Sequence, residues 1–179
     1  MNKYDEEFEC YIINFFGEFE RYKGIILDKK IKLINYFNKY LINYLPKYGK
    51  IKSRFSFFVI FIMSFFPLKN LIKKKRPEYL IIHLITSLPL LLLLLFNFET
   101  KFILRISGFP KLGFFRKILW KLALKKIFVV TCPTKNTLNY IKELNIVDPS
   151  KVRLLYDPVI NVKEILKKRE GKKIDYKNY

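Results

Sequence analysis

The tract from Lys75 to Leu94 limits the possible folds of this chain more than any other part, because it has two incompatible interpretations. As one run of about twenty mostly apolar residues, it is a candidate transmembrane helix. As two elements, it is a short buried strand over Tyr79–Leu84, followed by a helix that starts between Thr86 and Pro89. The two interpretations imply different classes of protein.

Several residues favour a strand followed by a helix. Thr86 or Ser87 can cap a helix by accepting hydrogen bonds from its first backbone N–H groups. Pro89 then falls in the first turn, where its missing N–H costs no hydrogen bond. A membrane-spanning helix would instead carry these residues and His83 near its middle. The unbroken apolarity of Tyr79–Ile82 is typical of a parallel strand that is covered on both faces.

The rest of the chain alternates between strand-like and helix-like segments. Asn38–Ser53 contains proline and glycine, which predicts a loop with a helical turn. Strands separated by helical stretches of about ten to fifteen residues indicate βαβ units with right-handed crossovers. The expected fold class is therefore α/β, with a Rossmann-like parallel sheet flanked by helices. The expected strands are Glu9–Phe16, Ile31–Phe37, Tyr79–Leu84, Lys101–Ile106, Ile127–Thr131 and Val152–Tyr156, and the other expected helices are Phe19–Leu27, Phe55–Phe66, Gly113–Leu124 and Thr134–Leu144.

The Phe55–Phe66 segment is a second candidate membrane element. Pro67 either kinks this helix or begins another helix that runs to Lys75. About twelve apolar residues fall short of the roughly twenty that cross a bilayer, so we expect a buried or interfacial helix. The alternative is a small basic membrane protein with two hydrophobic segments, residues 55–67 and 79–98.

The net charge of +20 restricts the partners of this chain. Neither Lys29–Pro77 nor Thr100–Lys142 contains an acidic residue. Such a surface attracts nucleic acid, anionic lipid headgroups or phosphorylated substrates, although A/T-rich codons for Lys, Ile, Asn, Phe and Tyr would also enrich these residues. We expect no nucleic-acid partner, because the sequence has no helix-turn-helix, RNA-recognition or zinc-finger signature.

The cysteines and the single histidine predict neither a disulfide framework nor a metal site. Cys10 and Cys132 are not spaced as a metal-binding pair. Both lie in apolar runs, so we expect buried, reduced thiols in a cytoplasmic protein. No tightly bound cofactor and no metal are expected.

Four short motifs carry a resemblance to a known family. Each is weak alone, but their order and spacing together are moderately specific. The segment over residues 8–165 resembles the N-terminal domain of family 4 glycosyltransferases, with Glu78 and Asp157 in place of the usual Asp and Asn, and Ile85 where a second His often stands. The motifs are Pro77-Glu78-Tyr79-Leu80-Ile81-Ile82-His83, Ile103-Leu104-Arg105-Ile106-Ser107-Gly108, Thr131-Cys132-Pro133-Thr134 and Leu155-Tyr156-Asp157-Pro158-Val159.

The resemblance implies one half of a GT-B enzyme, in which two Rossmann-type domains face each other across a cleft. We expect residues 1–160 to form the acceptor-side domain without its first βα unit, and residues 161–179 to form a charged linker, with the donor-binding domain absent. The implied activity is transfer of a sugar from a nucleotide-sugar donor to a glycan or a lipid-phosphate acceptor in envelope polysaccharide synthesis. We expect the chain to be inactive alone, and cytoplasmic, at the surface of the inner membrane.

Candidate site residues follow from the expected sheet, because ligands of open α/β sheets bind beyond the carboxyl ends of the strands. That edge carries His83 and Arg105 as expected catalytic residues, and Ser107, Gly108, Thr134 and Lys135 as expected acceptor- or phosphate-binding residues. Each has a simpler explanation. His83 fits a hydrogen-bonded core residue, Arg105 a loop-orienting residue, Gly108 a turn and Thr134 a helix cap.

Overall fold

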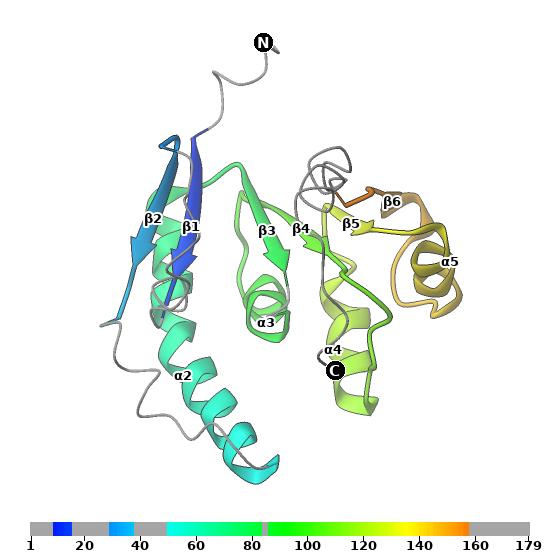
Figure 1. The fold of residues 1–179 in the computed structure, drawn as a ribbon, viewed down its shortest axis with the longest axis horizontal. Coiled ribbons are helices and arrows are strands. Elements are labelled where there is room, and N and C mark those ends of the chain that lie inside the picture. Colours follow the sequence, from blue (N-terminus) through cyan, green and yellow to red (C-terminus); the bar gives the residue numbers. More distant parts are fainter. Residues whose placement is uncertain (1–8, 16–28, 38–49, 84–85, 158–179) are drawn as a thin grey trace, which may run out of the picture. The chain divides into compact units, whose positions relative to one another are not determined.

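The computed structural model of the chain describes residues 9–15, 29–37, 50–83 and 86–157 (Figure 1). From β2 onward, strands and helices alternate along these residues, and every described strand pair is parallel. The chain divides into two compact units, Met1–Lys75 and Arg76–Tyr179. The predicted helix over Phe19–Leu27 and the predicted linker over residues 161–179 lie outside the described residues.

The first unit contains a two-stranded parallel sheet. β1 (Cys10–Asn14) pairs with β2 (Ile31–Asn35), so that Cys10 lies opposite Ile31 and Asn14 lies opposite Asn35. The side-chain amide of Asn14 donates a hydrogen bond to Asn35 Oδ1 (2.8 Å). Both predicted strands are therefore confirmed in their position.

The long helix of the first unit, α2 (Lys50–Lys75), corrects the predicted loop at its start, because Lys50–Ser53 is helical. The helix continues through Pro67, so no second helix begins there, and the alternative of a kink at Pro67 stays a prediction. Proline removes one backbone hydrogen bond from a helix interior, but the other bonds of a long helix remain. The hydroxyl of Tyr36 donates to the backbone carbonyl of Pro67 (3.2 Å).

Because α2 is continuous, it is longer than the apolar run that the sequence predicted as one helix. The segment Arg54–Lys75 has 22 residues and contains an 18-residue window with a mean hydropathy of 1.9, and it is the one described helix long and apolar enough to cross a membrane. Our expectation that this apolar run is too short is therefore wrong. α2 qualifies by length and composition only, and a core helix of a water-soluble protein meets the same two criteria.

The second unit is a four-stranded parallel sheet flanked by helices, a Rossmann-like α/β arrangement that confirms the expected fold class. The strands follow one another across the sheet as β3 (Tyr79–His83), β4 (Lys101–Arg105), β5 (Val129–Cys132) and β6 (Val152–Leu154). The connecting helices are α3 (Ser87–Leu95), α4 (Phe114–Ala123) and α5 (Lys135–Glu143), and the short 3-10 helix η2 (Pro149–Lys151) precedes β6.

The structure therefore confirms the decisive prediction for the tract Lys75–Leu94. Tyr79–His83 is a strand, and a separate helix follows with Thr86 at its N-cap and Pro89 in its first turn. Thr86 does not cap through its side chain, however, and that part of the prediction is wrong. Its hydroxyl instead accepts a hydrogen bond from Arg116 Nη2 (3.0 Å), a group 30 residues away in the sequence.

The two faces of this sheet differ sharply. The strand order β3-β4-β5-β6 advances in one direction across the sheet. Right-handed crossovers in such an order place all three connecting helices on the same face of the sheet. On that face lie fully buried side chains, with Ile82, Leu104 and Val130 at 2%, 0% and 0% exposure. On the opposite face Ile81 is 64% exposed. The expectation that β3 is covered on both faces is therefore wrong.

The two cysteines differ in environment, which corrects the prediction that both are buried. Cys10 is exposed in β1, whereas Cys132 is buried in β5, and neither forms a disulfide. Burial raises the pKa of the Cys132 thiol, because a thiolate is poorly stabilised away from water.

We expect a thiol reagent at mildly alkaline pH to modify Cys10 rapidly and Cys132 only after denaturant is added. Mass spectrometry of native and denatured samples measures this directly. The neutral buried thiol contributes its full stability below the ordinary thiol pKa, and this contribution declines as the pH rises through that value, since the unfolded chain then ionises. Equal native labelling of both thiols would contradict the assigned burial.

Candidate functional site

Strand register gathers most of the predicted site residues at one edge of the four-stranded sheet. His83 lies opposite Arg105, Arg105 lies opposite Thr131, and Thr131 lies opposite Arg153. Register partners in adjacent parallel strands share a face of the sheet. One row across all four strands therefore holds His83, Arg105, Thr131 and Arg153 on the same face, next to the carboxyl ends of the strands. His83 and Arg153 are exposed, Arg105 is half-buried, and Thr131 is buried.

The histidine of this row is solvent-exposed. His83 is the last residue of β3, and the neighbouring Ile82 points into the core at 2% exposure. The alternative of a hydrogen-bonded core histidine therefore does not apply here. An exposed imidazole at a sheet edge is able to exchange hydrogen bonds with a ligand hydroxyl.

Arg105 forms an ion pair across the same edge. Its guanidinium donates to a carboxylate oxygen of Asp157, which follows β6, and the two side chains are 23% and 63% exposed. The contact joins two of the four motifs, 52 residues apart in the sequence. The pair holds the segment after β6, as expected of a loop-orienting residue, and the Arg105 side chain remains 23% exposed; its catalytic role stays a prediction.

A backbone hydrogen bond fixes the start of the loop that follows β4. The backbone N–H of Ile106 donates to the carbonyl of Thr131 (2.9 Å), so strand pairing extends one residue beyond Arg105. Ser107 is exposed, and Gly108 follows it. A methyl group added at Gly108 would meet nothing within 4 Å, and its backbone is not in the left-handed region. Among the residues that the structure describes, neither crowding nor backbone conformation explains a glycine at this position.

Thr134 and Lys135 lie at the start of α5 on the same edge. Thr134 Oγ1 accepts a hydrogen bond from the backbone N–H of Thr137 (3.1 Å), so the hydroxyl acts as a helix cap. The helix N-terminus nevertheless contributes a partial positive charge to the edge, and Lys135 adds an exposed ammonium group. The site residues predicted from sequence thus lie together on one edge of the second unit.

Three residues of this edge were not predicted as site residues. Asp157 pairs with Arg105, Arg153 extends the cationic row, and Arg116 bonds to Thr86 after β3. Thr131 also has a buried hydroxyl without a hydrogen-bond partner in the described structure. A helical-wheel plot of α4 would have singled out Arg116, because it lies one turn before Trp120 on the same side of the helix. In the structure, the Arg116 guanidinium carbon is 5.7 Å from the centre of the Trp120 ring.

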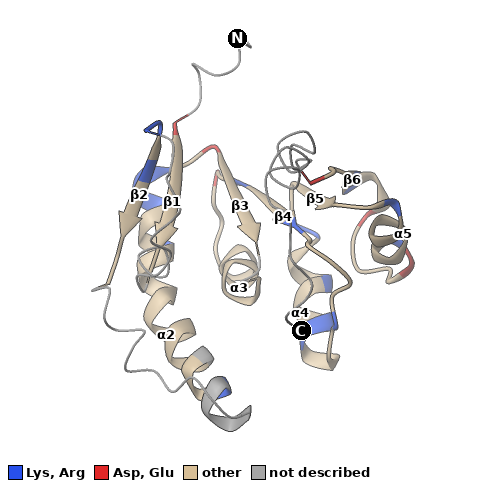
Figure 2. Ribbon diagram, in the orientation of Figure 1, with Lys and Arg blue, Asp and Glu red and all other residues tan. Residues whose placement is uncertain are grey.

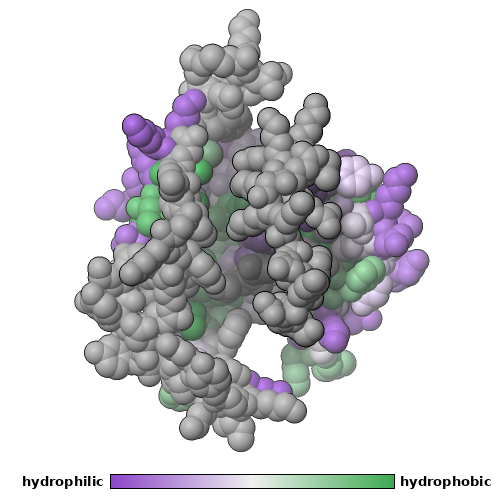
Figure 3. Space-filling model, in the orientation of Figure 1, coloured by the Kyte–Doolittle hydropathy of each residue, from purple (hydrophilic) through white to green (hydrophobic). Residues whose placement is uncertain are grey.

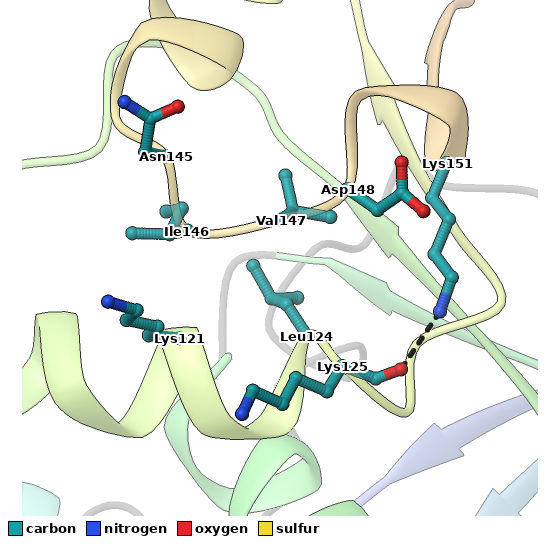
Figure 4. Close-up of a pocket in the computed structure, with 8 residues that line it drawn as sticks. All are labelled: Lys121, Leu124, Lys125, Asn145, Ile146, Val147, Asp148 and Lys151. Atoms are coloured by element: carbon teal, nitrogen blue, oxygen red, sulfur yellow. Dashed lines mark hydrogen bonds between the residues drawn. The ribbon is translucent and has the colours of Figure 1, made fainter.

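A separate cavity of about 390 Å³ lies elsewhere in the second unit (Figure 4). It is bordered by the end of α4 and by the turn before β6, and therefore lies at the amino-terminal edge of the sheet. Lys151 donates to the carbonyl of Lys125 (2.9 Å), and the backbone N–H of Ser150 lowers the pKa of Asp148. None of the predicted site residues lines it; the lining residues are Lys121, Leu124, Lys125, Asn145, Ile146, Val147, Asp148 and Lys151.

Chemically, the carboxyl edge combines cations, hydroxyl groups and one carboxylate. Arg105, Arg153 and Lys135 supply positive charge, and His83 and Ser107 supply exposed hydrogen-bonding groups. Such a set suits an anionic ligand that also carries hydroxyl groups. Comparisons of the chain with protein families, with curated protein sequences and with solved structures found no match.

Proposed function

We propose that this chain is the acceptor-side domain of a GT-B glycosyltransferase that transfers a sugar from a nucleotide-sugar donor to a lipid-phosphate or glycan acceptor. The observation that carries the proposal is the convergence of His83, Arg105, Ser107 and Lys135 on the carboxyl edge of one parallel sheet. This is where ligands of open α/β sheets bind. The resemblance of four ordered motifs to family 4 enzymes supports the same function.

The chemistry of sugar transfer explains the types of residue at the edge. The bond between the anomeric carbon and the nucleoside diphosphate breaks, the diphosphate leaves with the bonding electron pair, and a bond to the acceptor oxygen forms. If that oxygen belongs to a hydroxyl group, its proton passes to the His83 imidazole; a phosphate oxygen attacks without losing a proton. We propose that exposed His83 accepts a hydrogen bond from that hydroxyl. Arg105 and Lys135 offset negative charge on the acceptor or the leaving diphosphate. A second Rossmann-like domain would supply most of the donor contacts, and the activity is cytoplasmic, at the surface of the inner membrane.

The acceptor part of this proposal is tested by binding of a long-chain isoprenoid phosphate, with the uncharged isoprenoid alcohol as the matched ligand. We expect the phosphate to bind in detergent micelles by calorimetry and the alcohol to bind at least about tenfold more weakly. Arg105→Gln and Lys135→Gln should each weaken binding about tenfold. Lys142→Gln, at the far end of α5, is the control and should bind normally. Equal binding of phosphate and alcohol, or equal loss in the control, would reject the proposal.

Gly108→Ala separates ligand contact from turn formation. A methyl group meets nothing there, so we expect unfolding free energy to change by less than about 1 kcal/mol. If the backbone approaches a ligand at Gly108, the same variant binds the isoprenoid phosphate several-fold more weakly. Unchanged binding would assign Gly108 to the loop alone.

Asp157→Asn is expected to strengthen anion binding, because it removes the carboxylate that shares the Arg105 guanidinium. The pair is partly exposed, so we expect a gain of about twofold to fivefold in affinity for inorganic pyrophosphate at low salt. A titration at two salt concentrations measures this, with Asp148→Asn at the opposite edge as the control. A gain that persists in the Arg105→Gln background would show that Asp157 acts elsewhere.

A second candidate function, a small basic membrane protein, is favoured by the length of α2. Its other proposed segment, residues 79–98, folds as β3 and α3 and is not one helix. Alkaline carbonate extraction of membranes from expressing cells distinguishes the candidates. Release into the supernatant supports a peripheral enzyme domain, and retention supports a span by α2.

A further inference from the structure

The outward face of α4 is unusually apolar for a solvent-exposed surface. Phe114 and Phe115 are 75% and 84% exposed, the highest values among the large apolar side chains described. Ile118 and Leu122 follow on the same helix and are exposed too. Contiguous exposed apolar surface of this kind marks an interaction site.

Helix geometry places these four side chains together. Successive residues of an α-helix are rotated by about 100°, so Phe114, Phe115, Ile118 and Leu122 occupy an arc of about 100°. The buried residues Trp120 and Ala123 occupy the opposite side of the helix. The core does not require this second apolar arc, because α4 already has a separate buried face.

Basic residues border the arc. By the same geometry, Lys117 and Lys121 form a stripe along one side of the exposed apolar residues, and both are exposed. No acidic residue occurs between Thr100 and Lys142. Figure 2 shows α4 carrying blue basic segments and no red segment, and Figure 3 shows hydrophobic surface beside hydrophilic surface over the start of this helix.

We propose that this face of α4, defined by Phe114, Phe115, Ile118 and Leu122 with the lysine stripe, docks the protein on an anionic lipid bilayer. An amphipathic helix with aromatic residues on one side and lysines beside them lies in the plane of a membrane surface. A nucleic acid would leave the phenylalanines uncovered, and a protein partner would need an acidic rim around an apolar pocket. The bilayer satisfies both parts at once.

The docking face is also well placed for the candidate site. α4 starts after the β4 loop, so Phe114 and Phe115 lie at the carboxyl edge that carries Arg105 and Ser107. Arg116, between the phenylalanines and the lysines in sequence, turns inward and bonds to Thr86 at that edge. The membrane-docking proposal depends only on α4. It can therefore fail while the sugar-transfer proposal stands, and the sugar-transfer proposal can fail while membrane docking stands.

Vesicle flotation with the purified chain tests the docking face. We expect binding to vesicles of phosphatidylglycerol and phosphatidylcholine, and much weaker binding to phosphatidylcholine alone or at high salt. Phe114→Ser combined with Phe115→Ser should weaken binding about tenfold or more. Lys117→Gln combined with Lys121→Gln should weaken it about thirtyfold. These side chains are exposed, so circular dichroism should show unchanged folding.

The matched control replaces two exposed phenylalanines of α2, Phe58→Ser with Phe66→Ser, which are 61% and 62% exposed. Loss of vesicle binding in the α4 variants together with retention in the control supports the proposal. Retained binding by the α4 variants, or an equal loss in the control, overturns it. Self-association that the α4 phenylalanine variant abolishes, without any vesicle binding by the parent chain, also overturns it.

Discussion

Replacing Ile82 by aspartate is expected to unfold the second unit, whereas the same replacement at Ile81 is expected to be tolerated. Ile82 is 2% exposed and faces the helices, so a carboxylate there would be buried without a partner, at a cost of more than about 4 kcal/mol. That cost is comparable to the whole stability of a small domain.

The neighbouring residue provides the matched control. Ile81 lies on the open face of β3 at 64% exposure, so an aspartate there remains in water and costs at most about 1 kcal/mol. Urea unfolding followed by circular dichroism compares the two variants. A transmembrane helix over residues 79–98 would reject a charge at either position. Similar behaviour of the two variants would therefore contradict the strand.

Trp120→Ala is expected to lower the free energy of unfolding by about 3–5 kcal/mol, because it leaves a cavity where the largest buried side chain of the second unit lies. Trp120→Phe should cost much less, below about 1.5 kcal/mol, since it fills most of the space and removes an indole N–H that has no hydrogen-bond partner in the described structure.

Phe115→Ala on the same helix is the control for this series. Its side chain is 84% exposed, and the change should leave stability within about 0.5 kcal/mol of the parent chain. Denaturant midpoints of the three variants measure the series. A large loss at Phe115, or none at Trp120, would mean that the core and the docking face of α4 have been exchanged.

Local sequence patterns were sufficient for most of the secondary structure. Thr86 and Pro89 after His83 correctly separated β3 from α3, although Thr86 does not cap through its side chain, and Thr134 correctly marked the start of α5. Of the two alternatives predicted at Pro67, the start of a new helix is wrong, because a proline lowers the stability of a helix without ending one that packing and length support. β6 is shorter than predicted: its register with β5 ends at Cys132 and Leu154, and only the backbone N–H of Leu155 still donates to the carbonyl of Cys132 (2.9 Å).

The sequence predicted which strand ends meet at one edge of the sheet, but not the side-chain contacts made there. Polar residues at the ends of apolar strands pointed to His83, Arg105 and Thr134, because parallel strands bring their ends to one edge. The pairs Arg105–Asp157 and Arg116–Thr86 join residues 52 and 30 positions apart. No local pattern encodes such distances, which follow from strand order and register.

The amino-acid sequence by itself determined where strands and helices form, because hydrophobic period, helix caps and prolines act over a few neighbouring residues. Only the tertiary structure decided which face of each element is covered. Ile81 is exposed although its neighbour Ile82 is buried, and Cys10 is exposed whereas Cys132 is buried. Phe114 and Phe115 point outward from a helix whose other side holds buried Trp120. Burial depends on what packs against a residue, and that partner comes from a distant part of the chain.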